Sequence, residues 1–156
     1  PASDGILDST TMSSVSRSAL VNHSAQQMFA LVSDVEAYPT FLPWCGKASV
    51  SERGPGRTVA TLGINFRGVR KEFTTENRNS PNERIDMKLV SGPFRSLEGS
   101  WRFTPLSEKA CKVELDLHYE FAGALIGKVV GAVFDEIANS LVDAFARRAD
   151  LCFGSS

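Results

Sequence analysis

The sequence predicts an α+β fold in which a curved antiparallel sheet of about seven strands wraps around one long C-terminal helix. Apolar and polar residues alternate over much of the stretch 45–121, which is typical of antiparallel strands with one buried face. Residues 125–151 instead carry apolar side chains at helical spacing and contain no proline. The 156 residues, of which 42% are hydrophobic, suffice for one domain with a sizeable core.

The N-terminal part predicts a leader, a strand and a short helix. Residues 1–14 are polar and aperiodic, so we expect a disordered leader ahead of a domain that spans 15–153. The first strand is predicted at 15–21. Ser24 and Gln27 fit a capping box, which predicts a helix that begins at Ser24. Pro39 and Pro43 limit the following segment to at most one helical turn between them.

The alternation is clearest where apolar residues occupy every second position from Val113 to Phe121. Gly, Pro, Asn and Ser at 54–56, 79–82, 91–93 and 105–107 divide the region into runs of strand length. About six consecutive strands with short connections imply a meander. The apolar phase of the other clear runs comprises Ala60, Leu62, Ile64, Phe66, Ile85, Met87, Leu89, Leu97, Gly99, Trp101 and Phe103.

The C-terminal helix is predicted over 125–151, and at about 1.5 Å per residue it would be about 40 Å long. Arg147 and Arg148 suit the negative end of the helix dipole, and Gly154 is a suitable terminator. Because a curved sheet must cover its apolar face, we expect the sheet to grip this helix. The apolar stripe of the helix comprises Ile126, Val130, Val133, Ile137, Leu141 and Phe145.

Charge and the rarer residues narrow the chemistry. The chain has 17 basic and 18 acidic residues, without the basic excess of proteins that bind nucleic acid, and we expect no DNA partner. Its two histidines and three cysteines lack metal-ligand spacing, so no metal site is predicted. A sparse, odd number of cysteines without a secretion signal favours a reducing compartment and a cytoplasmic protein.

Catalytic motifs are also absent from the sequence, which contains no nucleophile elbow, P-loop or dinucleotide fingerprint. Ser100 and His118 fall on the polar phase of their strands, and His23 precedes the helix cap in an expected turn. General acid–base chemistry would depend on carboxylates such as Glu72 or Glu98, and nothing in the sequence pairs them. The sequence therefore predicts no catalytic residues and a protein that is not an enzyme.

Two segments resemble a known family. Residues 38–45, YPTFLPWC, are similar to its Y-P-x-F-L-P-W-C segment, and residues 92–103, GPFRSLEGSWRF, resemble its G-P-F-x-x-L-x-G-x-W-x-F segment. The family comprises coenzyme Q-binding proteins and ribosome-association toxins, also called oligoketide cyclase/lipid-transport proteins, of the START/Bet v 1-like superfamily. The resemblance covers about 13–152 and implies the helix-grip fold, with a START-like ligand-binding domain.

The resemblance implies a deep apolar cavity between sheet and helix that accepts a hydrophobic ligand. We therefore expect a non-enzymatic carrier of an isoprenoid quinone, most simply ubiquinone, that supports respiration. The bound quinone or lipid is its ligand, and no cofactor is required. We expect a cytoplasmic protein that lies peripherally at the inner membrane and contacts it transiently.

Two alternatives remain open at this point. One is a ribosome-associating toxin that inhibits subunit association, with contacts from the basic run Arg67, Arg70, Lys71 and Arg78. The other is a polyketide cyclase-like enzyme.

The expected ligand-binding residues combine the apolar phases with the two motifs. Trp101 and Tyr119 offer an N–H and an O–H to a quinone carbonyl. Arg70, Lys71 and Arg95 are candidate donors at the mouth. The full set is Phe41, Trp44, Leu62, Ile64, Phe66, Phe73, Met87, Phe94, Trp101, Phe103, Leu117, Tyr119, Val130, Phe134, Ile137 and Leu141.

Two features concern access to the cavity. Gly127 and Gly131, four residues apart in the long helix, predict either close helix–sheet approach or local flexibility. The segment 38–44 holds three aromatic residues and two prolines and is either a rigid hydrophobic plug or a gate. If its aromatic residues are exposed, they are a candidate contact with a bilayer or partner.

Overall fold

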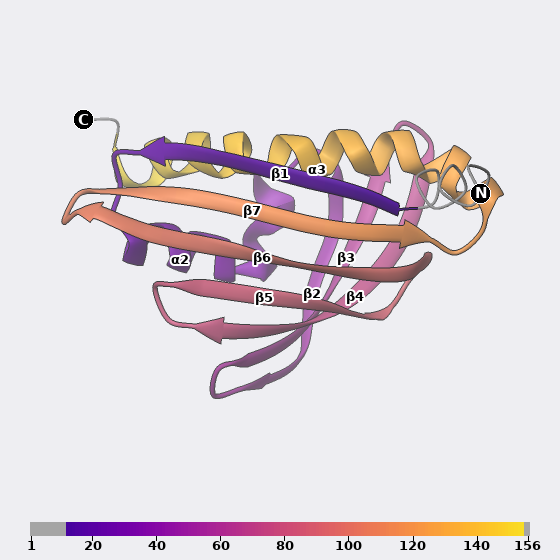
Figure 1. Cartoon of the computed structure of the whole chain (residues 1–156), viewed down its shortest axis with the longest axis horizontal. Helices are drawn as coiled ribbons and strands as arrows, with labels where there is room; N and C mark the ends of the chain where they lie inside the picture. The colour runs from indigo at the N-terminus through magenta and orange to yellow at the C-terminus, as the bar shows by residue number, and fades with distance from the viewer. Residues whose placement is uncertain (1–11, 155–156) are drawn as a thin grey trace, which may run out of the picture.

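The computed structural model describes residues 12–154, in which a long helix lies along one antiparallel sheet (Figure 1). Among these residues no helix combines the length and the apolarity that a membrane span requires. The elements are β1 (Met12–Val21), α2 (Ala25–Ser33), the 3₁₀ helix η1 (Val35–Thr40), β2 (Cys45–Gly54), β3 (Arg57–Phe66), β4 (Val69–Ser80), β5 (Arg84–Ser91), β6 (Phe94–Ser107), β7 (Ala110–Phe121) and α3 (Ala124–Phe153).

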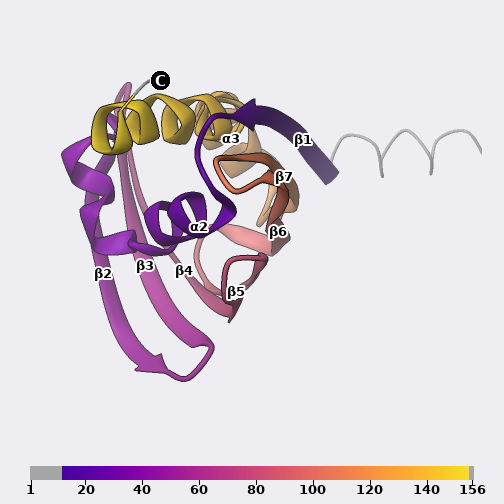
Figure 2. The same ribbon diagram turned by 90° about the vertical axis from the view of Figure 1, so that its left-hand side faces the viewer.

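The sheet has the strand order β1-β7-β6-β5-β4-β3-β2, and every neighbouring pair is antiparallel. The six strands β2 to β7 form the predicted meander, and β1 is added beside β7. Figure 2 shows the sheet bending so that β2–β4 and β7 lie on opposite sides of the interior, with α3 across the opening. The predicted sheet gripping a helix is therefore confirmed.

Strand β1 begins at Met12, so residues 12–14, which the sequence assigned to the leader, belong to the sheet. Polar pairing at the sheet edge explains the difference. The Oγ of Ser14 lies 2.9 Å from Nδ1 of His118, and Ser16 donates to Asp116 over 2.9 Å. These exposed hydroxyls extend the strand without an apolar pattern. The rest of the predicted leader, 1–11, lies outside the described residues.

Two of the predicted strand boundaries were wrong. The expected divisions omit the tight turn at Arg67 and Gly68, which have φ values of 51° and 81° and join β3 to β4. A type I′ hairpin turn requires positive φ at both positions, which suits Gly68, but arginine is not a residue that predicts it. Strand β6 also continues through the expected break at 105–107, because a register shift beyond Pro105 accommodates the proline.

The capping box of α2 is confirmed. The backbone N–H of Gln27 donates to Ser24 Oγ over 3.1 Å, and the Gln27 side chain accepts from the Ser24 N–H over 3.0 Å. The turn expected between the two prolines lies earlier, since η1 contains Pro39. Its bonds run from Ala37 N to Asp34 O and from Phe41 N to Tyr38 O, so neither requires an N–H from the proline.

Helix α3 runs for 30 residues and ends at Gly154, the predicted terminator, whose φ is 88°. Because the helix continues to Phe153, Arg147 and Arg148 lie before its last turn and do not occupy the expected position at the dipole's end. Three of the six residues in the predicted apolar stripe, Ile126, Val133 and Leu141, are only partly buried. The face of α3 that is buried against the sheet is displaced from the predicted stripe by about one residue along the sequence. That face comprises Val130, Gly131, Phe134, Ile137, Ala138, Val142, Phe145 and Ala149.

The concave face of the sheet carries the predicted apolar phase. In β7 the side chains of Val113, Leu115, Leu117 and Tyr119 are buried, while His118 between them is exposed. Gly99 faces Leu117 on the neighbouring strand, where the backbones approach closely. A Cβ atom at Gly99 would lie 2.4 Å from the carbonyl oxygen of Asp116, so this position excludes a side chain.

Candidate functional site

A cavity of about 80 Å³ lies between the concave face of the sheet and α3. Its lining comes from η1, from Trp44 just before β2, from β3 to β7 and from α3. Nine of the sixteen residues expected at the ligand site line this cavity: Trp44, Leu62, Phe73, Met87, Trp101, Leu117, Phe134, Ile137 and Leu141.

Nine further residues complete the lining. Leu97, Leu115 and Phe145 lie on the apolar faces that the sequence periodicity identifies, so the same pattern could have placed them at the ligand site. Thr75 and Asn77 could not be recognised from apolar periodicity, because their side chains are polar. They follow Phe73 at every second position of β4 and are buried on the same face of the sheet. The remaining lining residues are Val35, Tyr38, Ala60 and Ala138.

Seven expected residues lie elsewhere. Ile64 and Val130 are buried in the surrounding core, and Phe66 is partly buried beneath the Arg67 guanidinium, 4.9 Å from its ring. Phe103 packs against Phe29 of α2, with ring centroids 5.8 Å apart. Phe41 packs on α3 and is described below with its segment, while Phe94 and Tyr119 belong to an aromatic cluster next to the cavity.

The aromatic cluster consists of Phe73, Phe94, Tyr119, Phe121 and Phe134. The Phe134 ring lies at its centre, with centroid distances of 4.7 Å to Tyr119, 5.0 Å to Phe94, and 6.0 Å to both Phe73 and Phe121. Phe73 and Phe134 also line the cavity, and Phe121 lines a surface groove on the other side. The cluster therefore forms a partition between the cavity and the groove.

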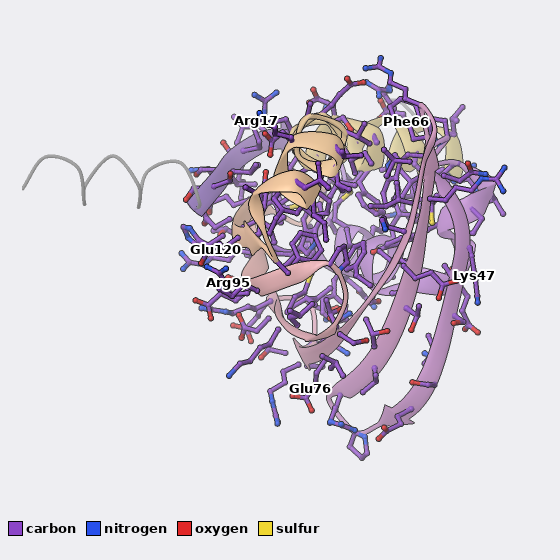
Figure 3. All side chains as sticks on the ribbon, turned by 90° about the vertical axis from the view of Figure 1, so that its right-hand side faces the viewer. Arg17, Lys47, Phe66, Glu76, Arg95 and Glu120 are labelled. Atoms are coloured by element: carbon purple, nitrogen blue, oxygen red, sulfur yellow. The ribbon has the colours of Figure 1, made fainter. Side chains whose placement is uncertain are left out.

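The surface groove has a volume of about 560 Å³ and lies beside the first turns of α3. Phe121 lies against Gly127 and Gly131, where an added Cβ atom would meet Phe121 Cβ at 3.8 Å and Cε2 at 3.6 Å. These are ordinary contact distances, so the helix does not approach the sheet closely enough here to require glycine. Arg95 lines the same groove and donates to Glu120 over 2.7 Å, a pair that Figure 3 shows on one flank of the molecule.

The hydroxyl of Tyr119 is not available to a ligand, contrary to expectation. It donates to Asp135 Oδ1 on α3, and the residue does not line the cavity. Burial, the hydrogen bond and the charge of Asp135 together raise the pKa of Tyr119 above its usual value. The sequence could not pair these residues, because they lie on different elements.

The segment 38–44 packs inward between the sheet and α3. Tyr38 donates to Val32 O over 2.6 Å, and its burial raises the pKa of the phenol. The Tyr38 and Phe41 rings lie 5.3 and 5.4 Å from Phe145, and Leu42 is buried. These contacts favour the plug over the gate.

The cavity is apolar and uncharged. None of the described residues that line it is Asp, Glu, Lys, Arg or His. The Thr75 hydroxyl donates to Asn77 Oδ1 over 2.8 Å, which pairs two of its few polar groups. Nε1 of Trp44 is buried and has no hydrogen-bond partner among the described residues. The site can therefore hold an apolar molecule.

The remaining candidates from the sequence lie apart from this cavity. Ser100 and His118 line a shallow groove on the outer face of the sheet, as their polar phase predicted. His23 lies in the bend before α2, where it is buried and bonded to Asp150 at 2.8 Å. Among residues 12–154, no group of three or more His, Cys, Asp or Glu side chains could hold a metal ion.

The expected basic contacts are partly neutralised. Arg67 bonds to Glu136 of α3 over 2.5 Å, and Arg78 lies 3.6 Å from Glu76. Arg70 and Lys71 have no ion pair among the described residues. They line a shallow outer groove and are not among the residues that line the cavity. Lys47 lines that groove too, on the flank opposite Arg95 in Figure 3.

An apolar cavity enclosed by a seven-stranded antiparallel sheet and a long C-terminal helix defines a helix-grip domain. The ZhuI aromatase/cyclase from Streptomyces sp. R1128 shares this fold, with a TM-score of 0.78 and 19% identity over 89% of this chain and 94% of that one. Residues 21–146 match the family model described as polyketide cyclase/dehydrase and lipid transport. The chain belongs to this family.

Two curated relatives carry different names. The ribosome association toxin RatA of Vibrio cholerae is 48% identical over 143 residues, which cover 92% of this chain and 99% of the toxin. The mitochondrial coenzyme Q-binding protein COQ10 homolog B of Xenopus laevis is 31% identical over 89% of this chain and 59% of its own length. The family expected from the two sequence segments is thus confirmed.

Proposed function

We propose that this protein binds an isoprenoid quinone, most simply ubiquinone, and carries it without chemical change. The apolar cavity beneath α3 is the observation that carries the proposal. Burial of apolar ligand surface contributes about 25 cal/mol per Å², so an isoprenoid tail needs only apolar walls. The similarity to a relative named as a coenzyme Q-binding protein supports this choice of ligand.

Ligand uptake requires the cavity to widen. Its volume of about 80 Å³ is smaller than the about 150 Å³ of an apolar cavity that admits benzene. Displacement of Phe134 and Phe121 would join it to the surface groove of about 560 Å³. The combined space falls within the range of about 300–1,000 Å³ that is typical of small-molecule sites.

The proposed role involves no catalysis and no required cofactor. The described lining offers no carboxylate, imidazole or amine for general acid–base chemistry, and the Tyr38 hydroxyl is bonded to the backbone. A relative named as a toxin and another named as a binding protein are consistent with this role.

We place quinone exchange at the surface of the inner membrane, on its cytoplasmic side. The first turns of α3 expose Leu125 and Val129, at 74% and 59% of their maximal area, next to the surface groove. Exposed apolar side chains beside an opening suit transient contact with a bilayer.

Ala138→Leu tests the ligand proposal, because Ala138 lines the cavity and is buried. The added carbon atoms fill space that a quinone ring would occupy, so we expect at least a tenfold loss of affinity. Titration with a short-tailed ubiquinone measures the affinity, and circular dichroism checks the fold. Asn139→Leu places the same side chain on the exposed face of α3, and its affinity should match the wild type.

Mass spectrometry of an organic extract from the purified protein is the accompanying measurement. We expect it to find quinone or a related lipid. Protein that is empty and also fails to take up ubiquinone would remove the proposal. Undiminished binding by Ala138→Leu would place the ligand elsewhere.

A second function, association with a ribosomal subunit that inhibits subunit joining, is supported by the 48% identity to a relative named as a ribosome association toxin. The groove lined by Lys47, Arg70 and Lys71 is a suitable contact for RNA phosphates through Arg70 and Lys71, while Lys47 donates to Glu72 of the same groove over 3.3 Å. In this reading the cavity is incidental.

Reversal of charge tests the second function. The double variant Arg70→Glu/Lys71→Glu should lose co-sedimentation with ribosomal subunits at low salt, since two phosphate contacts become repulsive. Arg102→Glu/Lys109→Glu makes the same change of net charge at exposed positions elsewhere and should co-sediment like the wild type. If the wild-type protein does not co-sediment at low salt, ribosome association is excluded.

A further inference from the structure

Trp44 is an unusual residue in the cavity wall. Its side chain lines the cavity and is only 5% exposed, yet the buried Nε1 has no acceptor among the described residues. Indole nitrogen is a donor only, so the group cannot be satisfied by another donor. Buried polar groups without a partner are rare in native proteins, and they often indicate a site that a ligand or water completes.

The surrounding groups show why the protein itself does not complete this bond. Tyr38 and Asn77 also line the cavity, where the Tyr38 hydroxyl donates to Val32 O and Asn77 Oδ1 accepts from Thr75, and neither oxygen is a hydrogen-bond partner of Trp44 Nε1. Arg148 lies with its guanidinium 4.9 Å from the Phe41 ring and is not part of the lining. The described lining therefore offers Trp44 a neutral and apolar environment.

This environment selects among ligand head groups. A carboxylate or phosphate would be buried here without a countercharge, which is strongly unfavourable. A pure hydrocarbon would leave the indole N–H unpaired. A neutral oxygen acceptor, such as a ring carbonyl, can accept from Nε1 once the cavity widens enough to expose this atom, at the cost of one lost water contact.

We propose that the ligand enters the cavity with a neutral carbonyl-type oxygen leading and that this oxygen accepts a hydrogen bond from Trp44 Nε1. The inference rests on the proposed function and specifies its ligand class, an apolar molecule with an uncharged acceptor head. It distinguishes quinones from fatty acids, phospholipids and hydrocarbons. Trp44 is the specificity-determining residue in this site, whereas sequence reasoning had selected Trp101 and Tyr119.

The test compares two probes with the same tail, decylubiquinone and decylbenzene, which lacks the ring oxygens. One neutral hydrogen bond corresponds to about tenfold in affinity. Trp44→Phe keeps an aromatic ring and removes the donor, so its affinity for decylubiquinone should fall about tenfold relative to its affinity for decylbenzene. Trp101→Phe removes the other indole donor of the lining, so a change of the ratio in Trp44→Phe and not in Trp101→Phe assigns the bond to Trp44. The matched control is His118→Phe, which removes a ring N–H on the exposed outer face of the sheet and should leave both affinities unchanged.

The indole signals give an independent readout. The chain has two tryptophans, so a nitrogen-15 spectrum contains two indole N–H signals, which Trp101→Phe assigns. Decylubiquinone should move the Trp44 signal downfield, and decylbenzene should not. This measurement shows whether the ligand accepts a hydrogen bond from Trp44 Nε1 even if Trp44→Phe does not fold.

The outcomes separate the inference from the proposed function. If neither probe binds the wild type, both are overturned. If decylubiquinone binds while Trp44→Phe leaves the affinity ratio unchanged and the Trp44 signal does not shift, only the inference is overturned, and Nε1 bonds to water. If the affinity for decylubiquinone relative to decylbenzene falls in Trp101→Phe and not in Trp44→Phe, Trp101 is the donor. This result would also overturn the inference.

Discussion

Phe134→Ala is expected to lower the free energy of unfolding by about 3–5 kcal/mol, the usual cost of deleting a buried aromatic ring. Phe134 is buried, and its ring contacts four other rings of the aromatic cluster at centroid distances between 4.7 and 6.0 Å. Its removal leaves a void between α3 and the sheet that these rings cannot fill without moving. Equilibrium unfolding in urea, followed by circular dichroism, measures the loss.

Phe153→Ala is the matched control, since Phe153 lies on the same helix and is 40% exposed. We expect it to cost less than about 1 kcal/mol, because little apolar area leaves the core. Equal losses for the two variants would show that the aromatic cluster does not hold α3 against the sheet. The partition between cavity and groove would then have another origin.

Gly99→Ala is expected to destabilise the protein by about 3 kcal/mol, near the upper end of the usual cost of overpacking. The new Cβ would lie 2.4 Å from Asp116 O and 3.0 Å from Leu117 Cα. These are backbone atoms of β7, so relief requires β6 and β7 to separate at the centre of the sheet. The shift of the urea midpoint at constant slope is the measurement.

The same substitution at Gly127 should have the opposite sign. Gly127 lies in α3, and an added Cβ would meet Phe121 at an ordinary contact distance of 3.8 Å. Alanine is the better helix former, so we expect a gain of about 0.5–1 kcal/mol. A Gly99→Ala variant as stable as the wild type would mean that the two strands can separate there without cost.

Much of the fold could be predicted because its signals are local. The alternation from Val113 to Phe121 identified the buried face of β7, and the Ser24–Gln27 capping box located the start of α2. The turn at Arg67 and Gly68 was not predicted, because a lone glycine is a weak signal and the positive φ of Arg67 is imposed by the pairing of β3 with β4.

The candidate site could be predicted only in part. Apolar periodicity identifies which side chains face inward, but it does not separate those that pack together from those that line a void. Leu115 and Tyr119 share one face of β7, yet the first lines the cavity and the second bonds to Asp135. The place of Thr75 and Asn77 in the lining, and the unpaired donor of Trp44, become visible only when five strands and a helix are brought together.

The pairing of β1 with β7 has a consequence for the order in which the protein folds. Ser16 and Asp116 are partners although 100 residues separate them in the chain. During synthesis the first strand therefore has no partner until the last strand has emerged, and the hairpins from β2 to β7 can form before it. Such distant pairing costs loop-closure entropy and slows folding. The closing steps are thus the docking of the two chain ends, β1 beside β7 and α3 across the open sheet.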